Sequence, residues 1–323
     1  MGKIALVVIY NHRYDSNISR VEDLYRGRFT NIFHLVPFYD GGRPGVIPVY
    51  ENSFRFQGYI AQGFKHFFMP EFEHYLFIAD DLVLNPVINE NNHREKLGLA
   101  TGSSFIPHLI SLHGMRNYWP RIREAYEFTV KKKGIEILKE LPGYDDALRQ
   151  FAAHGLEIKP LRHRQVFPSP GRSVRAWLRL VFSRQKQLFH FLSDGVMRWK
   201  YDLSYPLAGS YSDICAVSAG TVRRFCHFCG VFAAAGLHAE LALPTALVLS
   251  SDRIVTEKDL TLRGRALWPD GWNRLHGEND LAHDEIRELE KYNYDLAALL
   301  KNFPEGYLYL HPVKLSKWKS SAL

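Results

Sequence analysis

Residues 74–84 read HYLFIADDLVL, and the acidic pair Asp80–Asp81 interrupts a stretch that is otherwise apolar. Short apolar runs of this kind are typical of strands buried on both faces of a parallel sheet. We therefore predict a strand over residues 74–78 that ends at a polar turn.

Three further strand-like runs precede this one, at residues 3–10, 32–36 and 46–50. A helical spacing of apolar residues follows the first run, and another helix is predicted over 54–68. Strands that alternate with helices in this order predict an α/β fold, a doubly wound Rossmann-like sheet with right-handed crossovers.

The alternation fails between residues 97 and 202, where we expect a largely helical insertion or lid. Regular elements return after it, and the expected ones are a strand-like run over 205–217, helices over 221–235, 239–249 and 284–301, and a last strand over 307–311. The chain is accordingly divided into residues 1–96, 97–202 and 203–323.

The composition of the 323-residue chain is that of a globular protein, with 46% hydrophobic and 23% charged residues. No apolar run approaches the roughly 20 residues that cross a bilayer, and the start shows no signal-peptide pattern. Three cysteines are too few for a disulfide framework. The expected location is therefore the cytoplasm.

The net charge of +7 predicts attraction to an anionic partner. An amphipathic segment over 174–192 carries arginines opposite Trp177 and Phe182, which suits docking at an anionic surface on the inner face of a membrane. A helix packed on the core with a solvated basic face is an equally open interpretation. No nucleic-acid-binding signature is present, so nucleic acid is not an expected partner.

Asp80 and Asp81 follow a buried strand, at the place where open α/β sheets bind their ligands. Mg²⁺ and Mn²⁺ prefer oxygen ligands and reach a protein through one or two carboxylates, while substrate phosphates complete the shell. The pair is therefore a candidate divalent-metal site, with a solvated turn as the alternative.

The run from Tyr75 to Leu84 resembles the strand and Asp-x-Asp motif of GT-A glycosyltransferases. In one alignment Ile78 replaces the first aspartate and Asp80 is the second; in the other, Ala79 replaces the first and Asp81 is the second. Metal binding is assigned to the two acids jointly. The resemblance covers residues 1–95 and 203–316 and implies a GT-A-like mixed, mainly parallel sheet.

Near the end of the chain, Leu310-His311-Pro312-Val313-Lys314 resembles the C-terminal histidine and nearby lysine of several GT-A enzymes. The resemblance implies that His311 completes the metal shell and that Lys314 meets the diphosphate. Imidazole and ammonium groups suit these roles chemically. We expect both residues to lie beside Asp80 and Asp81.

For the nucleotide, the end of the first strand supplies Tyr10, Asn11 and Arg13, and Tyr10 is expected to stack on the base. Further candidates for nucleotide binding are Asp40, Gln57 and Gln62.

On the acceptor side, Leu207 to Asp213 resembles the strand and turn that face the acceptor in the same superfamily, and Asp213 is expected to hold sugar hydroxyls. Glu240 lies in an apolar segment, so burial is expected to raise its pKa into the range of a general base. The alternative interpretation of Glu240 is a helix-capping or exposed acid.

These residues together predict a metal-dependent glycosyltransferase, with Mn²⁺ or Mg²⁺ as cofactor, a nucleotide-diphosphate sugar as donor, and a glycan or lipid-linked acceptor. Residues 1–96 would bind the nucleotide sugar and residues 203–323 the acceptor, the metal and the diphosphate. A sugar-phosphate nucleotidyltransferase and a non-catalytic scaffold for glycans or membranes are the alternatives.

Overall fold

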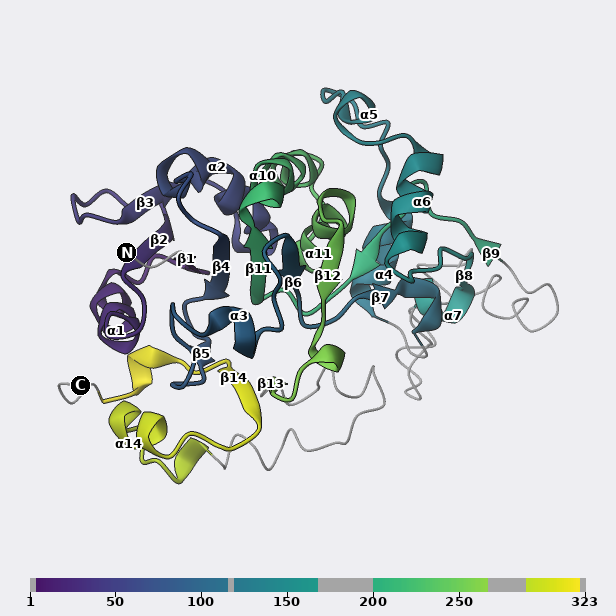
Figure 1. Cartoon of the computed structure of the whole chain (residues 1–323). Coiled ribbons are helices and arrows are strands. Elements are labelled where there is room, and N and C mark those ends of the chain that lie inside the picture. The colour runs from purple at the N-terminus through teal and green to yellow at the C-terminus, as the bar shows by residue number, and fades with distance from the viewer. Residues whose placement is uncertain (1–3, 116–118, 168–199, 267–288, 320–323) are drawn as a thin grey trace, which may run out of the picture.

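A computed structural model describes residues 4–115, 119–167, 200–266 and 289–319. Its centre is a seven-stranded sheet in the order β3–β2–β1–β4–β11–β6–β12 (Figure 1). All neighbouring strands run parallel except β11, which is antiparallel to β4 and β6. The fold is thus a mixed, mostly parallel α/β sheet flanked by helices, compatible with a Rossmann-like architecture.

The strands of the main sheet are β1 (Ile4–Ile9), β2 (Asn31–Pro37), β3 (Val46–Val49), β4 (His74–Ala79), β6 (Ser103–Phe105), β11 (Ile214–Ser218) and β12 (Arg253–Val255). The α-helices of the described ranges are α1 (Asp15–Tyr25), α2 (Gln57–Phe67), α3 (His93–Lys96), α4 (Pro120–Glu127), α5 (Ile137–Glu140), α6 (Tyr144–Ala153), α7 (His163–Val166), α10 (Ala219–Ala234), α11 (Ala239–Ser250) and α14 (Leu296–Lys301). The predicted strands and helices of the first 80 residues are confirmed.

The sheet separates two apolar layers, because successive side chains of a strand point to opposite faces. In β1, Ala5 and Val7 belong to the cluster that includes α2, α10 and α11, whereas Leu6 and Val8 belong to the cluster that includes α1 and the C-terminal segment. Burial on both faces explains the unbroken apolar run of this strand.

The range 97–202 begins with a strand of the main sheet, since β6 lies between β11 and β12. The sequence gives little sign of β6 because it is only three residues long. The chain then leaves the sheet at β7 (Ile110–Ser111), which pairs with β10 (Ala208–Gly209). Between these two strands lie α4 to α7 and the short pair β8 (Leu161–Arg162) and β9 (Lys200–Tyr201).

The amphipathic segment 174–192 lies outside the described residues, so the membrane-docking interpretation stays a prediction. Among the helices that the structure describes, none is long and apolar enough to cross a bilayer.

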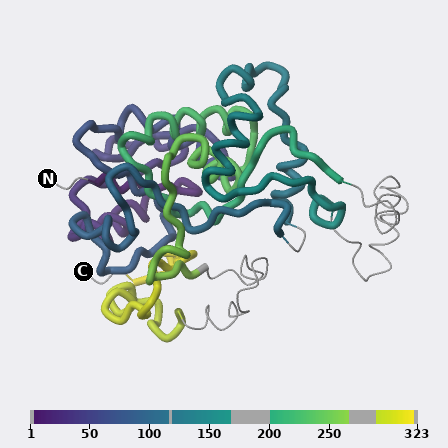
Figure 2. Tube along the Cα trace, turned by 45° about the vertical axis from the view of Figure 1, so that its right-hand side comes forward, coloured from purple at the N-terminus to yellow at the C-terminus, as the bar shows by residue number. Residues whose placement is uncertain are grey.

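The C-terminal segment forms a second, three-stranded sheet in the order β13–β14–β5, from β13 (Arg263–Ala266), β14 (Tyr307–His311) and β5 (Val83–Leu84). The last strand is therefore present as predicted, and it lies in this small sheet and not in the main one. In Figure 2 the yellow C-terminal segment lies against the N-terminal half of the chain, and Arg20 donates a 2.7 Å hydrogen bond to the carbonyl of Leu315.

The helix predicted over 284–301 is interrupted in its described part: residues 289–290 are helical, residues 291–294 form turns, and α14 begins at Leu296. Asn293 and Tyr294 adopt left-handed backbone angles, with φ of 51° and 54°, which a continuing right-handed helix does not allow. Asp295 caps the new start, because its side chain accepts a 3.1 Å hydrogen bond from Ala298 N–H.

Tyr25, at the end of α1, holds the segment that follows Asp81. Its buried hydroxyl donates a 2.8 Å hydrogen bond to the carbonyl of Leu82 and accepts a 3.1 Å bond from Leu84 N–H. Both partners lie in buried residues, so each depends on this hydroxyl.

Tyr25→Phe is expected to lower the free energy of unfolding by about 1–3 kcal/mol, because a buried carbonyl and a buried N–H lose their partner. Urea unfolding of this variant and of Tyr14→Phe, whose ring is 46% exposed, measures the difference. Equal midpoints for the two variants would contradict the assigned role of Tyr25.

Candidate functional site

Three carboxylates meet at the carboxyl edge of the main sheet. Asp80 and Asp81 follow β4, and Asp213 precedes β11. Since β11 runs antiparallel to β4, its beginning lies beside the end of β4, and Ala79 N–H donates a 2.9 Å hydrogen bond to the carbonyl of Asp213. The one antiparallel strand therefore brings Asp213 to the acidic turn.

His311 reaches the same cluster from the small sheet. β14 pairs with β5, which begins two residues after Asp81, and Val313 N–H donates a 2.6 Å hydrogen bond to the carbonyl of Asp81. His311 Nε2 lies 2.9 Å from Asp81 Oδ1 and 3.9 Å from Asp213 Oδ1. The expected contact between His311 and the acidic pair is present, although the strand that delivers it belongs to another sheet.

Tyr211 fixes the other side of the imidazole. Its hydroxyl forms a short hydrogen bond with His311 Nδ1, and its ring stacks on Tyr309 at a centroid distance of 6.0 Å. A hydroxyl both donates and accepts, so Tyr211 supports either tautomer of His311. The ring of His311 is thereby held with Nε2 toward Asp81.

Burial governs the charges of this cluster. Removal from water raises the pKa of Asp80 to about 7, and the nearby charge of Asp81 adds to the effect. Burial also raises the pKa of Asp213, against the opposing charge of His311. For His311, burial lowers the pKa, but the carboxylates of Asp213 and Asp81 outweigh it and the pKa is raised overall.

The Asp81–His311 pair has the spacing of two ligands of one ion. Adjacent ligands of an octahedral cation at 2.0–2.1 Å lie about 3 Å apart, and the two facing atoms, both buried, are 2.9 Å apart. Within the described residues no group of three or more His, Cys, Asp or Glu side chains has the arrangement of a metal site. A hydrogen-bonded ion pair between an imidazolium and a carboxylate has the same spacing.

Asp80 is oriented differently from Asp81. It is 6% exposed, and Asn11 N–H lies 3.4 Å from its Oδ1. Its carboxylate thus faces the end of β1, whereas Asp81 faces His311. Lys314 is exposed and comes directly after Val313, so the backbone places it at the rim of the cluster.

Arg13 and Asp40 lie together at the carboxyl ends of β1 and β2. The guanidinium of Arg13 pairs with the carboxylate of Asp40 and donates a 3.1 Å hydrogen bond to the carbonyl of Phe38. The hydrogen bond from Arg13 lowers the pKa of Asp40. These two candidates therefore remain at the sheet edge on which the acidic cluster lies.

Three nucleotide candidates have other roles in the structure. Tyr10 is fully buried and its hydroxyl is 3.0 Å from His34 Nδ1, so its ring has no free face for a base. Gln57 is buried and donates a 2.7 Å bond to the carbonyl of Leu237. Gln62 bonds both the N–H and the carbonyl of Tyr50. The expectation of base stacking by Tyr10 is corrected, because the residue belongs to the core.

Glu240 lies in the first turn of α11, close to the turn that carries Asp213. Its backbone carbonyl accepts a 3.0 Å hydrogen bond from Ser210 N–H, and its side chain accepts a 3.0 Å bond from Arg121 Nε. Burial raises the pKa of Glu240 to about 7, although Arg121 opposes the shift. His238 caps the helix, with Nδ1 3.2 Å from Glu240 N–H.

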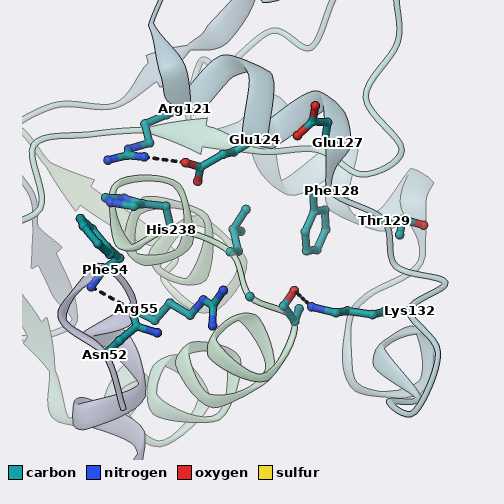
Figure 3. A pocket seen from close by; sticks show the side chains of 13 residues that line it. Asn52, Phe54, Arg55, Arg121, Glu124, Glu127, Phe128, Thr129, Lys132 and His238 are labelled. Atoms are coloured by element: carbon teal, nitrogen blue, oxygen red, sulfur yellow. Dashed lines mark hydrogen bonds and ion pairs between the residues drawn. The ribbon is translucent and has the colours of Figure 1, made fainter.

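Arg121 and His238, which both contact Glu240, also line a pocket of about 630 Å³ (Figure 3). It lies between the turn before α2, helix α4 and the junction of α10 with α11. At the sheet edge Asn11, Phe56, Ser212 and Asp213 lie around a crevice too narrow to admit a water molecule.

Tyr211, Arg121 and His238 were not among the candidate residues from the sequence. Tyr211 gave no signal apart from its place in the segment before Asp213, and its contact with His311 spans 100 residues. Arg121 comes from the range 97–202, for which the sequence offers no motif, so only the packing of α4 against α11 reveals it.

Comparison with protein-family models, with curated proteins and with solved structures gave no match to this chain. The geometry of the site therefore has to carry any assignment of function.

Without metal, wild-type stability should fall as the pH rises from about 4.5 to 6. A carboxyl whose pKa is about 7 in the folded chain and about 3.9 when unfolded binds its proton more tightly in the fold. Raising the pH removes that proton and its stabilisation, with a slope of up to ~1.4 kcal/mol per pH unit. The Asp80→Asn variant should show a flatter profile.

Urea unfolding in chelator at several pH values measures this slope, with Asp252→Asn, an exposed acid, as the matched control. A profile for Asp80→Asn as steep as that of the control variant would show that Asp80 ionises normally.

Proposed function

We propose that this protein is a glycosyltransferase that transfers a sugar from a nucleotide-diphosphate donor bound through a divalent cation. The observation that carries the proposal is the Asp81–His311 pair at the carboxyl edge of the sheet, whose facing atoms are buried and 2.9 Å apart. Ligands of open α/β sheets bind at this edge. The resemblance of residues 75–84 and 310–314 to GT-A enzymes supports the same assignment.

In this proposal Asp81 and His311 hold Mn²⁺ or Mg²⁺, and Tyr211 keeps the His311 ring in its orientation. The cation would neutralise the charge that develops on the departing diphosphate. Lys314, at the rim, adds a positive charge to the same phosphates. Arg13 and Asp40 are assigned to binding of the nucleoside. They follow β1 and β2, whose carboxyl ends lie on the same sheet edge as Asp81.

On the acceptor side, Asp213 is assigned to hydroxyl groups of the acceptor and Glu240 to its deprotonation. A pKa of about 7 suits a general base at neutral pH, since the group is then partly ionised and still basic. The hydrogen bond from Arg121 fixes the carboxylate and keeps its pKa from rising further. Proton removal by Glu240 implies direct attack on the anomeric carbon with inversion.

Nucleotide sugars should raise the unfolding temperature only when Mn²⁺ or Mg²⁺ is present, because the carboxylates otherwise repel the diphosphate. Asp81→Asn and His311→Ala should each weaken the metal-dependent binding by about tenfold or more. A thermal-shift screen of nucleotide sugars, with Mn²⁺ and with chelator, measures both effects.

The matched control for Asp81→Asn is Asp252→Asn, which removes an exposed acid by the same change. Equal stabilisation in chelator, or equal loss in the control variant, would refute the metal-bridged donor site.

Glu240→Gln should reduce kcat by about 10²–10⁴-fold, the usual contribution of a general base, while donor binding is retained. Lys314→Ala should lower kcat more than metal affinity, because its charge counts most as the diphosphate departs. Donor consumption with a glycan acceptor measures both effects. Full activity of Glu240→Gln would remove the assigned base and favour a retaining mechanism.

A further inference from the structure

The pocket in Figure 3 contains more positive charge than its own carboxylates balance. Its charged lining residues are Arg55, Arg121, Lys132, Glu124 and Glu127. Arg121 pairs with Glu124 at 2.5 Å and with Glu240 at 3.0 Å. Glu127 pairs at 2.8 Å with Arg123, which is not part of the lining. The charges of Arg55 and Lys132 therefore remain unbalanced within the pocket.

Arg55 and Lys132 converge on one point. A Cβ atom placed on Gly236 would lie 3.0 Å from Lys132 Nζ and 3.2 Å from Arg55 Nη2. Lys132 donates a 2.5 Å hydrogen bond to the carbonyl of Ala235, whereas no ion pair joins either cation to a carboxylate of the described residues. Two like charges that face the same point repel unless an anion lies between them.

His238 adds an uncharged donor to this group. Burial, together with the charges of Arg121 and Arg55, lowers its pKa to about 3, so the imidazole is neutral. Nδ1 accepts from Glu240 N–H, which leaves the proton of the neutral ring on Nε2. The pocket wall thus includes a guanidinium, an ammonium and a neutral imidazole.

We propose that this pocket binds an oxyanion, a phosphate or a carboxylate, carried by the molecule that accepts the sugar. The identity of that molecule as the acceptor rests on the proposed function, whereas anion binding in the pocket does not. The position is suitable, because Arg121 and His238, which line the pocket, both contact Glu240. A volume of about 630 Å³ accommodates one or two sugar rings.

Helix α10 ends beside Arg55 and Lys132. Its carboxyl end explains, without any ligand, why one cation lies there. The carboxyl end of a helix attracts positive charge, and Lys132 already bonds the carbonyl of Ala235. Arg55 forms no such bond to the helix end, and Figure 3 shows its guanidinium pointing into the pocket. An anionic ligand would pair this second charge, so the two cations are tested together.

The test is a titration of the full chain with glucose 6-phosphate, glucuronic acid and glucose, in chelator and without nucleotide. The unfolding temperature at each concentration reports the binding. Glucose 6-phosphate or glucuronic acid should bind more tightly than glucose, and the better of the two identifies the anion. The double variant Arg55→Gln with Lys132→Gln should bind that probe about tenfold or more weakly, the loss expected for charge-assisted hydrogen bonds.

The matched control is Lys131→Gln with Lys133→Gln, which removes the same charge from two exposed neighbours outside the pocket. Its affinity should stay within about twofold of the wild type, because neither side chain lines the pocket. Arg55→Gln alone serves if the double variant does not fold.

Equal affinity for glucose and both anionic probes, or equal loss in the control, would overturn the proposal. Because donor and metal are absent from this titration, a failure here is separate from a failure of the metal-dependent donor test. If the chain binds an anionic probe but no nucleotide sugar, the anion site is supported and its assignment to the sugar acceptor is refuted.

Discussion

The antiparallel pairing of β14 with β5 holds the C-terminal segment against the loop that carries Asp80 and Asp81. Tyr25 supports β5 from the side of α1, and Val313 bonds the backbone of Asp81. Because of these contacts, the imidazole of His311 faces Asp81, although the two residues are 230 positions apart in the sequence. Every part of the candidate site that involves His311 depends on this pairing.

A second constraint is the low polarity of the sheet edge. Acids that follow a strand buried on both faces lose water, and the raised pKa values of Asp80 and Asp213 express the cost. A positive partner lowers this cost, and in the metal-free chain His311 supplies part of that charge. The imidazole lies 2.9 Å from Asp81 and 3.9 Å from Asp213, where it offsets this cost most directly.

The sequence was sufficient where local pattern determines structure. The apolar runs of β1 and β4 indicate a parallel sheet, and the acids after β4 mark its ligand edge. It was insufficient where long-range packing decides. The burial of Tyr10 against His34, the membership of β14 in a separate sheet and the approach of Arg121 to Glu240 all depend on residues distant in the chain. Polar residues near a strand end, such as Gln57, look alike in sequence whether they bind a ligand or the backbone.

The pairing of β7 with β10 has a consequence for how this fold can diversify. Because Ser111 and Ala208 are partners, the two ends of the segment between them lie side by side outside the main sheet, and its described residues, 112–115, 119–167 and 200–207, form an excursion from the sheet. Helix α4 and Lys132, which line one wall of the pocket, belong to that excursion, whereas Asp81 and His311 do not. Replacement of the described part of this excursion by another of different length or charge would alter what enters the pocket and, through the loss of Arg121, the surroundings of Glu240, whereas the contact between Asp81 and His311 would keep its geometry.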